Sequence, residues 1–183
     1  MKFDDFAVGQ TFAASIKIEK ADFDAYIAFA RIRNILHENP ALAASEGITG
    51  TLLPGRAIIA RAEGEMTRLP EFSDCVMLLY GIDGDPEWGG RQTRFIGEAY
   101  AGESLAVKYT VAAKREEKGY GILRVDYEIS RAGRLVVVSR GNLYRIKKFE
   151  IAEAQPDACD KVRGVPPGRQ HRRQQPDQHG RPA

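Results

Sequence analysis

Two residues in the first third of the chain have the side chain or position that acid–base chemistry on a carbonyl compound would need. His37 is the only histidine before the C-terminal tail, so any imidazole chemistry of the folded part must use it. Gly55 follows Pro54 at a predicted helix start, where the first amides lack an intrahelical partner and lie at the positive end of the helix dipole. Its N–H could therefore stabilise a developing oxyanion. A structural histidine and a simple turn into a core helix are the alternative interpretations.

Predicted helices flank His37 on both sides. Apolar residues recur at helical spacing over residues 21–32, and Pro54 opens a longer apolar stripe over residues 54–69. Pro40 is predicted to start a short alanine-rich helix that Gly47 ends in a left-handed conformation. His37 therefore falls in a polar turn between two helices, ahead of a long helix that is predicted to be buried and central.

Beyond residue 69 the apolar pattern changes from helical to alternating, which indicates strands. The predicted strands are residues 75–82, 91–100, 105–111, 122–129 and 135–146, with a charged turn at 114–119, a tight turn at 132–133, and an earlier strand or arm at 11–19. Strands joined by short turns must be antiparallel. One long apolar helix with such a sheet predicts an α+β fold, the hot-dog arrangement of an antiparallel sheet wrapped around a central helix.

Several segments resemble the MaoC-like (R)-specific enoyl hydratase/dehydratase family. The family motif is Gly-Asp-x-Asn-Pro-(Leu/Ile)-His, followed by a His-Gly that begins the central helix, and the spacing from His37 to Gly55 matches it without a gap. Residues 3–10, 93–95 and 100–105 resemble the family's opening segment and a later strand pair. The resemblance covers about residues 3 to 147 and implies a single hot-dog domain.

The resemblance also implies site residues, with two departures. In the family an Asp and a His share the activated water, and the Asn helps to hold the site. Asn34 and His37 fall on the Asn and His positions, but Ile32 replaces the Asp and Pro54 replaces the His of His-Gly. The catalytic residues that carry over are thus His37, Asn34 and Gly55. The acid–base partner of the histidine is missing, and such a group typically raises the reaction rate by about 10²–10⁴-fold.

Three functions are compatible with this altered motif. The first is an enoyl-CoA or enoyl-ACP hydratase/3-hydroxyacyl dehydratase with a degenerate motif. The second is a hot-dog acyl-CoA thioesterase with Glu63 as base or nucleophile, and the third is a non-catalytic acyl-CoA-binding subunit. Glu38, next to His37, could replace the missing Asp if the local backbone is irregular.

Two residues are predicted to contact substrate. Arg56, with Arg31 and Arg33 near the same site, could bind a CoA phosphate or a substrate carboxylate, or could simply be solvated. Trp88, which precedes Gly89-Gly90, could line an acyl pocket or serve packing. No cofactor is expected, since CoA or phosphopantetheine enters as part of the acyl-CoA or acyl-ACP substrate.

Composition indicates one globular domain with a tail. The 183 residues are 43% hydrophobic and 28% charged, with a net charge of +2. We predict a domain at residues 1–150 and a disordered, basic, Pro/Gln/Arg-rich tail at 151–183 without specific nucleic-acid binding. The two cysteines lack metal-ligand spacing, and the N-terminus lacks a signal-peptide apolar region, so a cytoplasmic protein without a metal site or membrane segment is expected. The family resemblance implies a homodimer or higher homo-oligomer.

Overall fold

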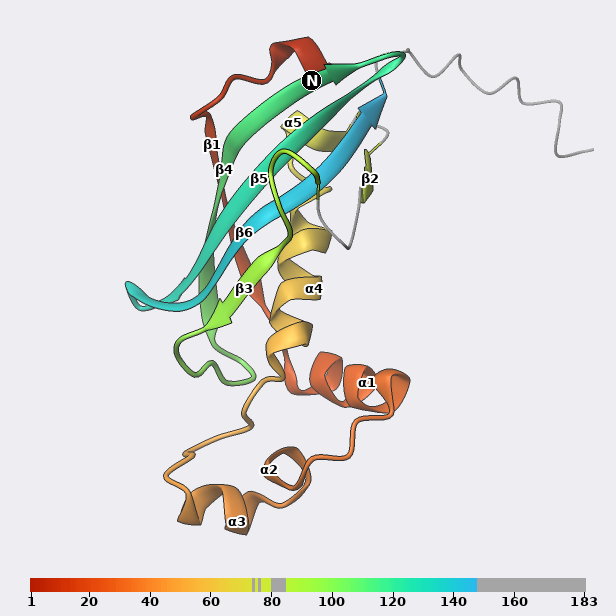
Figure 1. Cartoon of the computed structure of the whole chain (residues 1–183). Coiled ribbons are helices and arrows are strands. Elements are labelled where there is room, and N and C mark those ends of the chain that lie inside the picture. Colours follow the sequence, from red (N-terminus) through yellow and green to blue (C-terminus); the bar gives the residue numbers. More distant parts are fainter. Residues whose placement is uncertain (74, 76, 80–84, 148–183) are drawn as a thin grey trace, which may run out of the picture. The chain divides into compact units, whose positions relative to one another are not determined.

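The computed structural model describes residues 1–73, 75, 77–79 and 85–147, and its strands form one antiparallel sheet (Figure 1). The strands are β1 (Thr11–Lys17), β2 (Met77–Leu79), β3 (Gln92–Phe95), β4 (Ser104–Glu117), β5 (Tyr120–Arg131) and β6 (Arg134–Lys147). Their order is β1-β4-β5-β6-β2, and β3 pairs with β6 as well. The helices are a 3₁₀ turn (Phe3–Asp5), α1 (Lys20–Ala30), α2 (Ile35–Glu38), α3 (Pro40–Ser45), α4 (Gly55–Met66) and α5 (Pro70–Ser73). The predicted α+β hot-dog arrangement is confirmed.

The long helix α4 supplies the centre of the core. Ala57, Ile58, Ala62 and Met66 are buried, which matches the predicted apolar stripe. The hydroxyl of Tyr109, on β4, donates to the Ala62 carbonyl at 2.7 Å and both groups are buried. This contact fixes the helix against the sheet, because a buried hydroxyl without a partner would be costly. The helix thereby holds its first residues at a defined place.

The start of α4 differs by one residue from the prediction. Pro54 was expected at the first helical position, but its ψ of 131° is extended and it is the N-cap, so that the helix begins at Gly55. Proline has no N–H and a fixed φ, and both suit the cap as well as the first turn. The prediction of a helix to residue 69 is also too long, since α4 ends at Met66 and α5 follows after a short turn.

The charged turn predicted at residues 114–119 is wrong. Strand β4 continues to Glu117 and β5 begins at Tyr120, so only two residues turn, and Gly119 has a φ of +82°. Charged side chains do not mark a turn here because they have partners. Lys114 Nζ donates to the carbonyls of Phe3 and Phe6 at 3.3 and 2.7 Å.

The other predicted strands agree in place but not always in length. The tight turn at residues 132–133 is confirmed, with positive φ at Ala132 and Gly133 as a two-residue hairpin requires. The strands predicted at residues 11–19 and 91–100 are shorter in the structure. Strand β2 lies inside the predicted 75–82 segment, whose remaining residues 76 and 80–82 lie outside the described residues, as does the predicted tail. No helix in the described ranges is long and apolar enough to cross a membrane.

Helix α1 ends in an unusual backbone conformation at Arg31. Its φ and ψ are 51° and 38°, in the left-handed region, while its N–H donates to the Ala28 carbonyl at 3.3 Å. An L side chain in this region costs roughly 1–2 kcal/mol, which glycine avoids. Arg31 aligns with the glycine of the motif described above, and here it adopts a conformation to which glycine is better suited.

We therefore expect Arg31→Gly to raise the free energy of unfolding by about 1 kcal/mol, since relief of the left-handed strain exceeds the added entropy of glycine in the unfolded chain. Urea denaturation measures this change. Arg33→Gly is the matched control, because Arg33 is exposed and does not have positive φ, and it should not stabilise the protein. An Arg31→Gly variant no more stable than wild type would contradict the expectation.

Candidate functional site

A pocket of about 390 Å³ brings His37 and Gly55 together. Its walls come from the link after α1, from α2, from the start of α4 and from the end of β3. Arg56 lines the same pocket, and so does Ile32, the residue at the position of the missing Asp. These four positions, which the sequence analysis assigned to one site, therefore line one pocket; their roles in a site stay a prediction.

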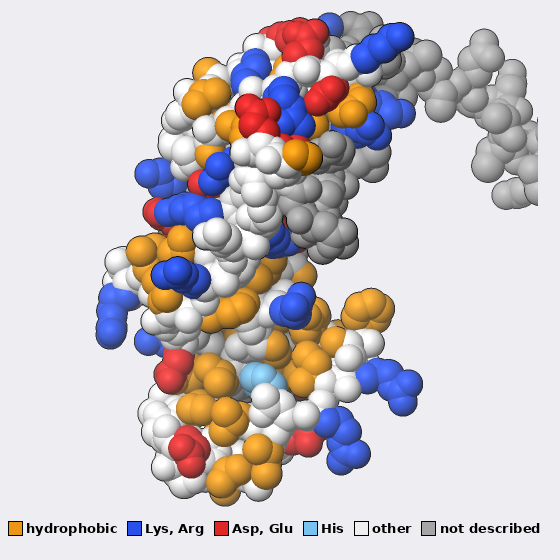
Figure 2. All heavy atoms as spheres, in the orientation of Figure 1, with side chains coloured by type: hydrophobic (Ala, Val, Ile, Leu, Met, Phe, Trp, Pro, Cys, Tyr) orange, Lys and Arg blue, Asp and Glu red, His pale blue; other side chains and the backbone are white. Residues whose placement is uncertain are grey.

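His37 lies on α2, a single helical turn, and its ring is held by a backbone group. Nδ1 lies 3.0 Å from the carbonyl oxygen of Leu52. Because a carbonyl can only accept, we assign the proton to Nδ1, which leaves the lone pair on Nε2. The ring also meets Phe23 edge to face, with centroids 6.1 Å apart. The half-buried imidazole, pale blue in Figure 2, is bordered by hydrophobic side chains.

Asn34 positions His37 rather than lining the pocket. It is the N-cap of α2, and its Oδ1 accepts a hydrogen bond from the Leu36 N–H at 3.0 Å. Such a cap typically contributes about 1 kcal/mol to a helix, a large share for a helix of one turn. The side chain is exposed and is not among those that line the 390 Å³ pocket.

Gly55, the first residue of α4, lines the pocket. Within the described part of the chain the Gly55 N–H has no hydrogen-bond acceptor, as expected for the first residue of a helix. The Phe95 ring lies over this residue, and a Cβ built at Gly55 would come within 2.2 Å of Phe95 Cε1. Glycine is thus required for this approach, although Phe95 is 52% exposed and is not locked in place.

One arginine lines the pocket and two more are chain neighbours of a lining residue. Arg56 lines it, and Arg31 and Arg33 flank Ile32 in the chain; all three are exposed, and among the described residues none of them forms an ion pair. The acidic lining residue is Glu98, whose carboxylate accepts a hydrogen bond from the Tyr100 hydroxyl. Within the lining the charges of Arg56 and Glu98 balance, so the excess positive charge near the pocket comes from Arg31 and Arg33.

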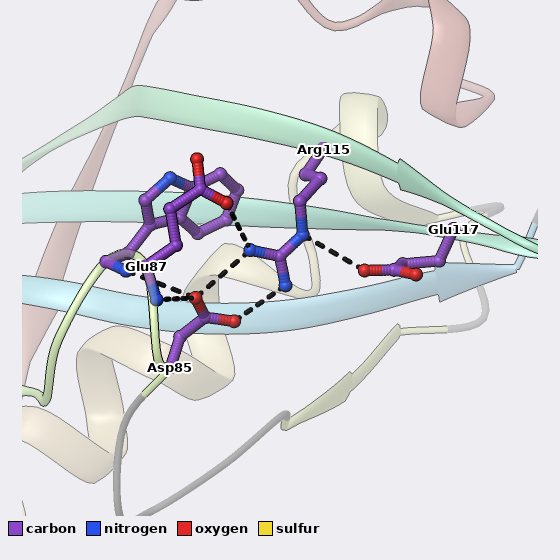
Figure 3. A network of polar contacts seen from close by, with 5 residues as sticks. Asp85, Glu87, Arg115 and Glu117 are labelled. Carbon is purple, nitrogen blue, oxygen red and sulfur yellow. Dashed lines mark hydrogen bonds and ion pairs between the residues drawn. The ribbon is translucent and has the colours of Figure 1, made fainter.

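Trp88 lies elsewhere, in the polar network of Figure 3. Its ring stacks on the Arg115 guanidinium, 4.6 Å from the ring centroid. Arg115 donates to both carboxylate oxygens of the buried Asp85, at 3.0 and 2.6 Å, and Asp85 also accepts from the N–H groups of Glu87 and Trp88. These contacts join the loop after residue 84 to β4. Trp88 is not among the residues that line the pocket with His37.

This network should make the free energy of unfolding depend on pH in the acidic range. The Arg115 hydrogen bonds, assisted by two backbone N–H groups and opposed by burial, hold the pKa of Asp85 well below its usual range. Its contribution is therefore complete above the unfolded-state pKa of about 3.9 and is lost as the pH falls towards the folded-state pKa. We expect Asp85→Asn to lower the urea midpoint of unfolding at neutral pH. The difference in urea midpoint between the variant and wild type, here called the gap, should narrow from about pH 5 towards pH 2. A constant gap over that range would contradict this role.

Glu63 lies in a separate contact between α4 and the sheet. It pairs with Arg91 at 2.5 Å, and both side chains are a little over a quarter exposed. Arg91 also donates to the Tyr127 hydroxyl at 2.8 Å, whose pKa burial raises to about 12. Glu63 thus has a cationic partner, and it does not line the pocket that contains Gly55. No cluster of His, Cys, Asp or Glu in the described ranges could hold a metal ion.

Two parts of the site were not predicted as such. Phe95 was recognised only as part of a strand, and Leu52 was not considered, because a backbone carbonyl carries no sequence signal. Glu38, the proposed substitute for the missing Asp, is exposed and follows His37 on α2. It is not among the residues lining the pocket with Gly55.

No protein-family model matches the sequence, and no curated protein matches it significantly. Solved structures do match. An (R)-hydratase from A. caviae involved in PHA biosynthesis is 22% identical, with a TM-score of 0.59 over 78% of this chain and 97% of its own. A MaoC-like dehydratase from Rhodospirillum rubrum is 18% identical, with a TM-score of 0.60 over 80% of this chain and 97% of its own.

A third match is a truncated 3R-hydroxyacyl-ACP dehydratase complex from Mycobacterium tuberculosis, 12% identical, with a TM-score of 0.59 over 76% of this chain and 95% of its own. Each match covers nearly the whole of the solved chain. At these identities the matches show a shared arrangement of sheet and helix, not shared side chains. The chain has the hot-dog fold of the MaoC-like hydratases and dehydratases.

Proposed function

We propose that the protein catalyses the reversible hydration of a 2-enoyl thioester. The observation that carries this proposal is the pocket that His37 and Gly55 line together, in which an imidazole with its lone pair on Nε2 and an unpaired N–H are available to one ligand. The fold is shared with solved hydratases and dehydratases, which is consistent with this chemistry.

The reaction needs one base, one oxyanion donor and one acid. His37 Nε2 removes a proton from water while the water oxygen bonds to Cβ of the enoyl group. The C=C electrons move towards the thioester, whose oxygen becomes negative and accepts the Gly55 N–H. The imidazolium then protonates Cα and the carbonyl re-forms, giving a 3-hydroxyacyl thioester. One hydrogen-bond donor to the oxyanion typically lowers the activation free energy by about 3–4 kcal/mol.

The arginines near the pocket favour a phosphate-bearing thioester. Arg56 lines the pocket, while Arg31 and Arg33 flank Ile32, the residue of another wall, in the chain. A guanidinium binds phosphate oxygens with two parallel hydrogen bonds, and both CoA and phosphopantetheine carry phosphate. The substrate is thus an acyl-CoA or an acyl-ACP, and we expect a homodimer or a larger homo-oligomer.

Acyl-thioester binding without turnover is the second candidate function. It is favoured by Ile32, which lines the pocket with His37 and cannot transfer a proton. In that case the pocket would bind the same ligands but hydrate none of them.

Turnover of crotonyl-CoA and of longer and aromatic 2-enoyl-CoA thioesters tests these functions. Enoyl absorbance and free thiol are followed in the same reaction. Loss of enoyl absorbance without thiol release is the result expected for hydration. Thiol release that Glu63→Gln abolishes would indicate thioester hydrolysis instead, and binding without any turnover would leave the second candidate.

A further inference from the structure

A second hollow adjoins the pocket on the other side of His37. It encloses about 740 Å³ between α1, α2, α3 and the loop over residues 47–52. Its apolar walls include Phe23 and Ile48, both buried, together with Ile27 and Leu36, which are partly buried. A volume of this size is typical of small-molecule sites, and the hydration chemistry described above does not use it.

The two hollows adjoin at His37 and Leu52. Both residues line the 390 Å³ pocket and both line the 740 Å³ hollow, and they are joined by the hydrogen bond from Nδ1 to the Leu52 carbonyl at 3.0 Å. The contact of Phe23 with the imidazole ring is on the side of the larger hollow, since Phe23 lines only that one. A ligand that contacts the imidazole therefore lies next to both hollows.

The smaller pocket has limited room for an acyl chain. It must already hold the thioester at Gly55 and the end of the pantetheine arm, and the Phe95 ring lies over the same helix start. The reacting Cβ has to approach His37, and every carbon beyond Cβ lies further from the thioester. The apolar space available next to His37 is the larger hollow.

We propose that the hollow between α1, α2 and α3 binds the distal part of a medium-length acyl chain, while the thioester lies in the smaller pocket. This inference rests on the proposed function, because it takes the position of the thioester from it. Polar groups are found mainly at the rim, where Lys20 pairs with Asp24 at 2.5 Å and Glu38 is exposed. The buried part of the hollow is apolar, so it favours an alkyl chain over a chain that ends in a charged group.

Calorimetric binding of saturated acyl-CoA esters tests the inference without requiring turnover. Butyryl-CoA and decanoyl-CoA are compared on the full-length protein, and wild type should bind the longer ester more tightly, by about fourfold for each methylene that is buried. Ala44 is exposed on α3 and lines the hollow, whereas Ala41, exposed on the same helix, does not. Ala44→Trp should weaken decanoyl-CoA binding by at least about tenfold and change butyryl-CoA binding by less than about twofold.

Ala41→Trp is the matched control and should change neither affinity. Ala44→Leu adds less volume and should give a smaller loss of the same kind, so the result does not depend on a tryptophan variant that folds. Equal affinity of wild type for the two esters, or an Ala44→Trp variant that binds decanoyl-CoA as well as wild type does, would overturn the inference. Chain-length-dependent binding without enoyl turnover would instead count against the proposed hydration alone.

Discussion

Ile32→Asp should increase enoyl-CoA hydration by roughly 10²-fold or more, the usual effect of adding a positioned acid–base group. Ile32 lines the pocket with His37 and Gly55, and it occupies the motif position at which the family carries its Asp. Arg31 and Arg33 are its neighbours in the chain, and their charges favour the ionised form of a carboxylate placed between them. The measurement is kcat with crotonyl-CoA.

Ile32→Asn is the control for this prediction. It has nearly the shape and polarity of aspartate but cannot accept a proton, so its kcat should stay at or below that of wild type. Both variants lose the apolar contacts of a half-buried isoleucine and should be destabilised to a similar degree, which thermal unfolding can establish. If the kcat of Ile32→Asp is no higher than that of Ile32→Asn, the absence of a carboxylate at position 32 is not what limits hydration by the wild-type protein.

His37→Ala should lower kcat by about 10²–10⁴-fold, because the proposed mechanism gives this one imidazole both proton transfers. Binding of a saturated acyl-CoA should change much less, since Gly55 and the arginines remain. Added imidazole should restore part of the lost turnover by entering the space that the side chain leaves. This rescue distinguishes an acid–base role from a structural one, which a soluble base would not repair.

Asn34→Ala is the informative comparison for that experiment. It removes the α2 cap and leaves the imidazole, so a smaller loss of kcat without imidazole rescue is expected. Unchanged kcat in His37→Ala would contradict the assignment of His37 as the base, whatever the behaviour of Asn34→Ala.

The longer helices and the 132–133 hairpin turn were predictable because their signals are local. The stripe of α4 and the 132–133 turn each follow from side-chain periodicity or turn chemistry. The end of β4 was not predictable, since the groups that satisfy its charges, such as the Phe3 carbonyl for Lys114, lie far away in sequence. Long-range partners override local polarity, and a single sequence does not reveal them.

The site was predictable to the extent that a motif carries it. Spacing and resemblance predicted that His37, Gly55 and Ile32 lie close together, and the structure has all three in the lining of one pocket. Trp88 was predicted either to line an acyl pocket or to serve packing, and the structure places it against Arg115, 27 positions away in sequence. An isolated aromatic residue gives no indication of which cation it will stack on, so its location required the structure.

The short length of α2 has a consequence for the energy of the site. A helix of four residues has almost no stability of its own, so the place of His37 depends on the Asn34 cap and on the bond to the Leu52 carbonyl. The free energy needed to release the imidazole is thus that of a few hydrogen bonds, well below the free energy that holds the sheet together. The proposed base can leave its position in a protein whose core is still fully folded.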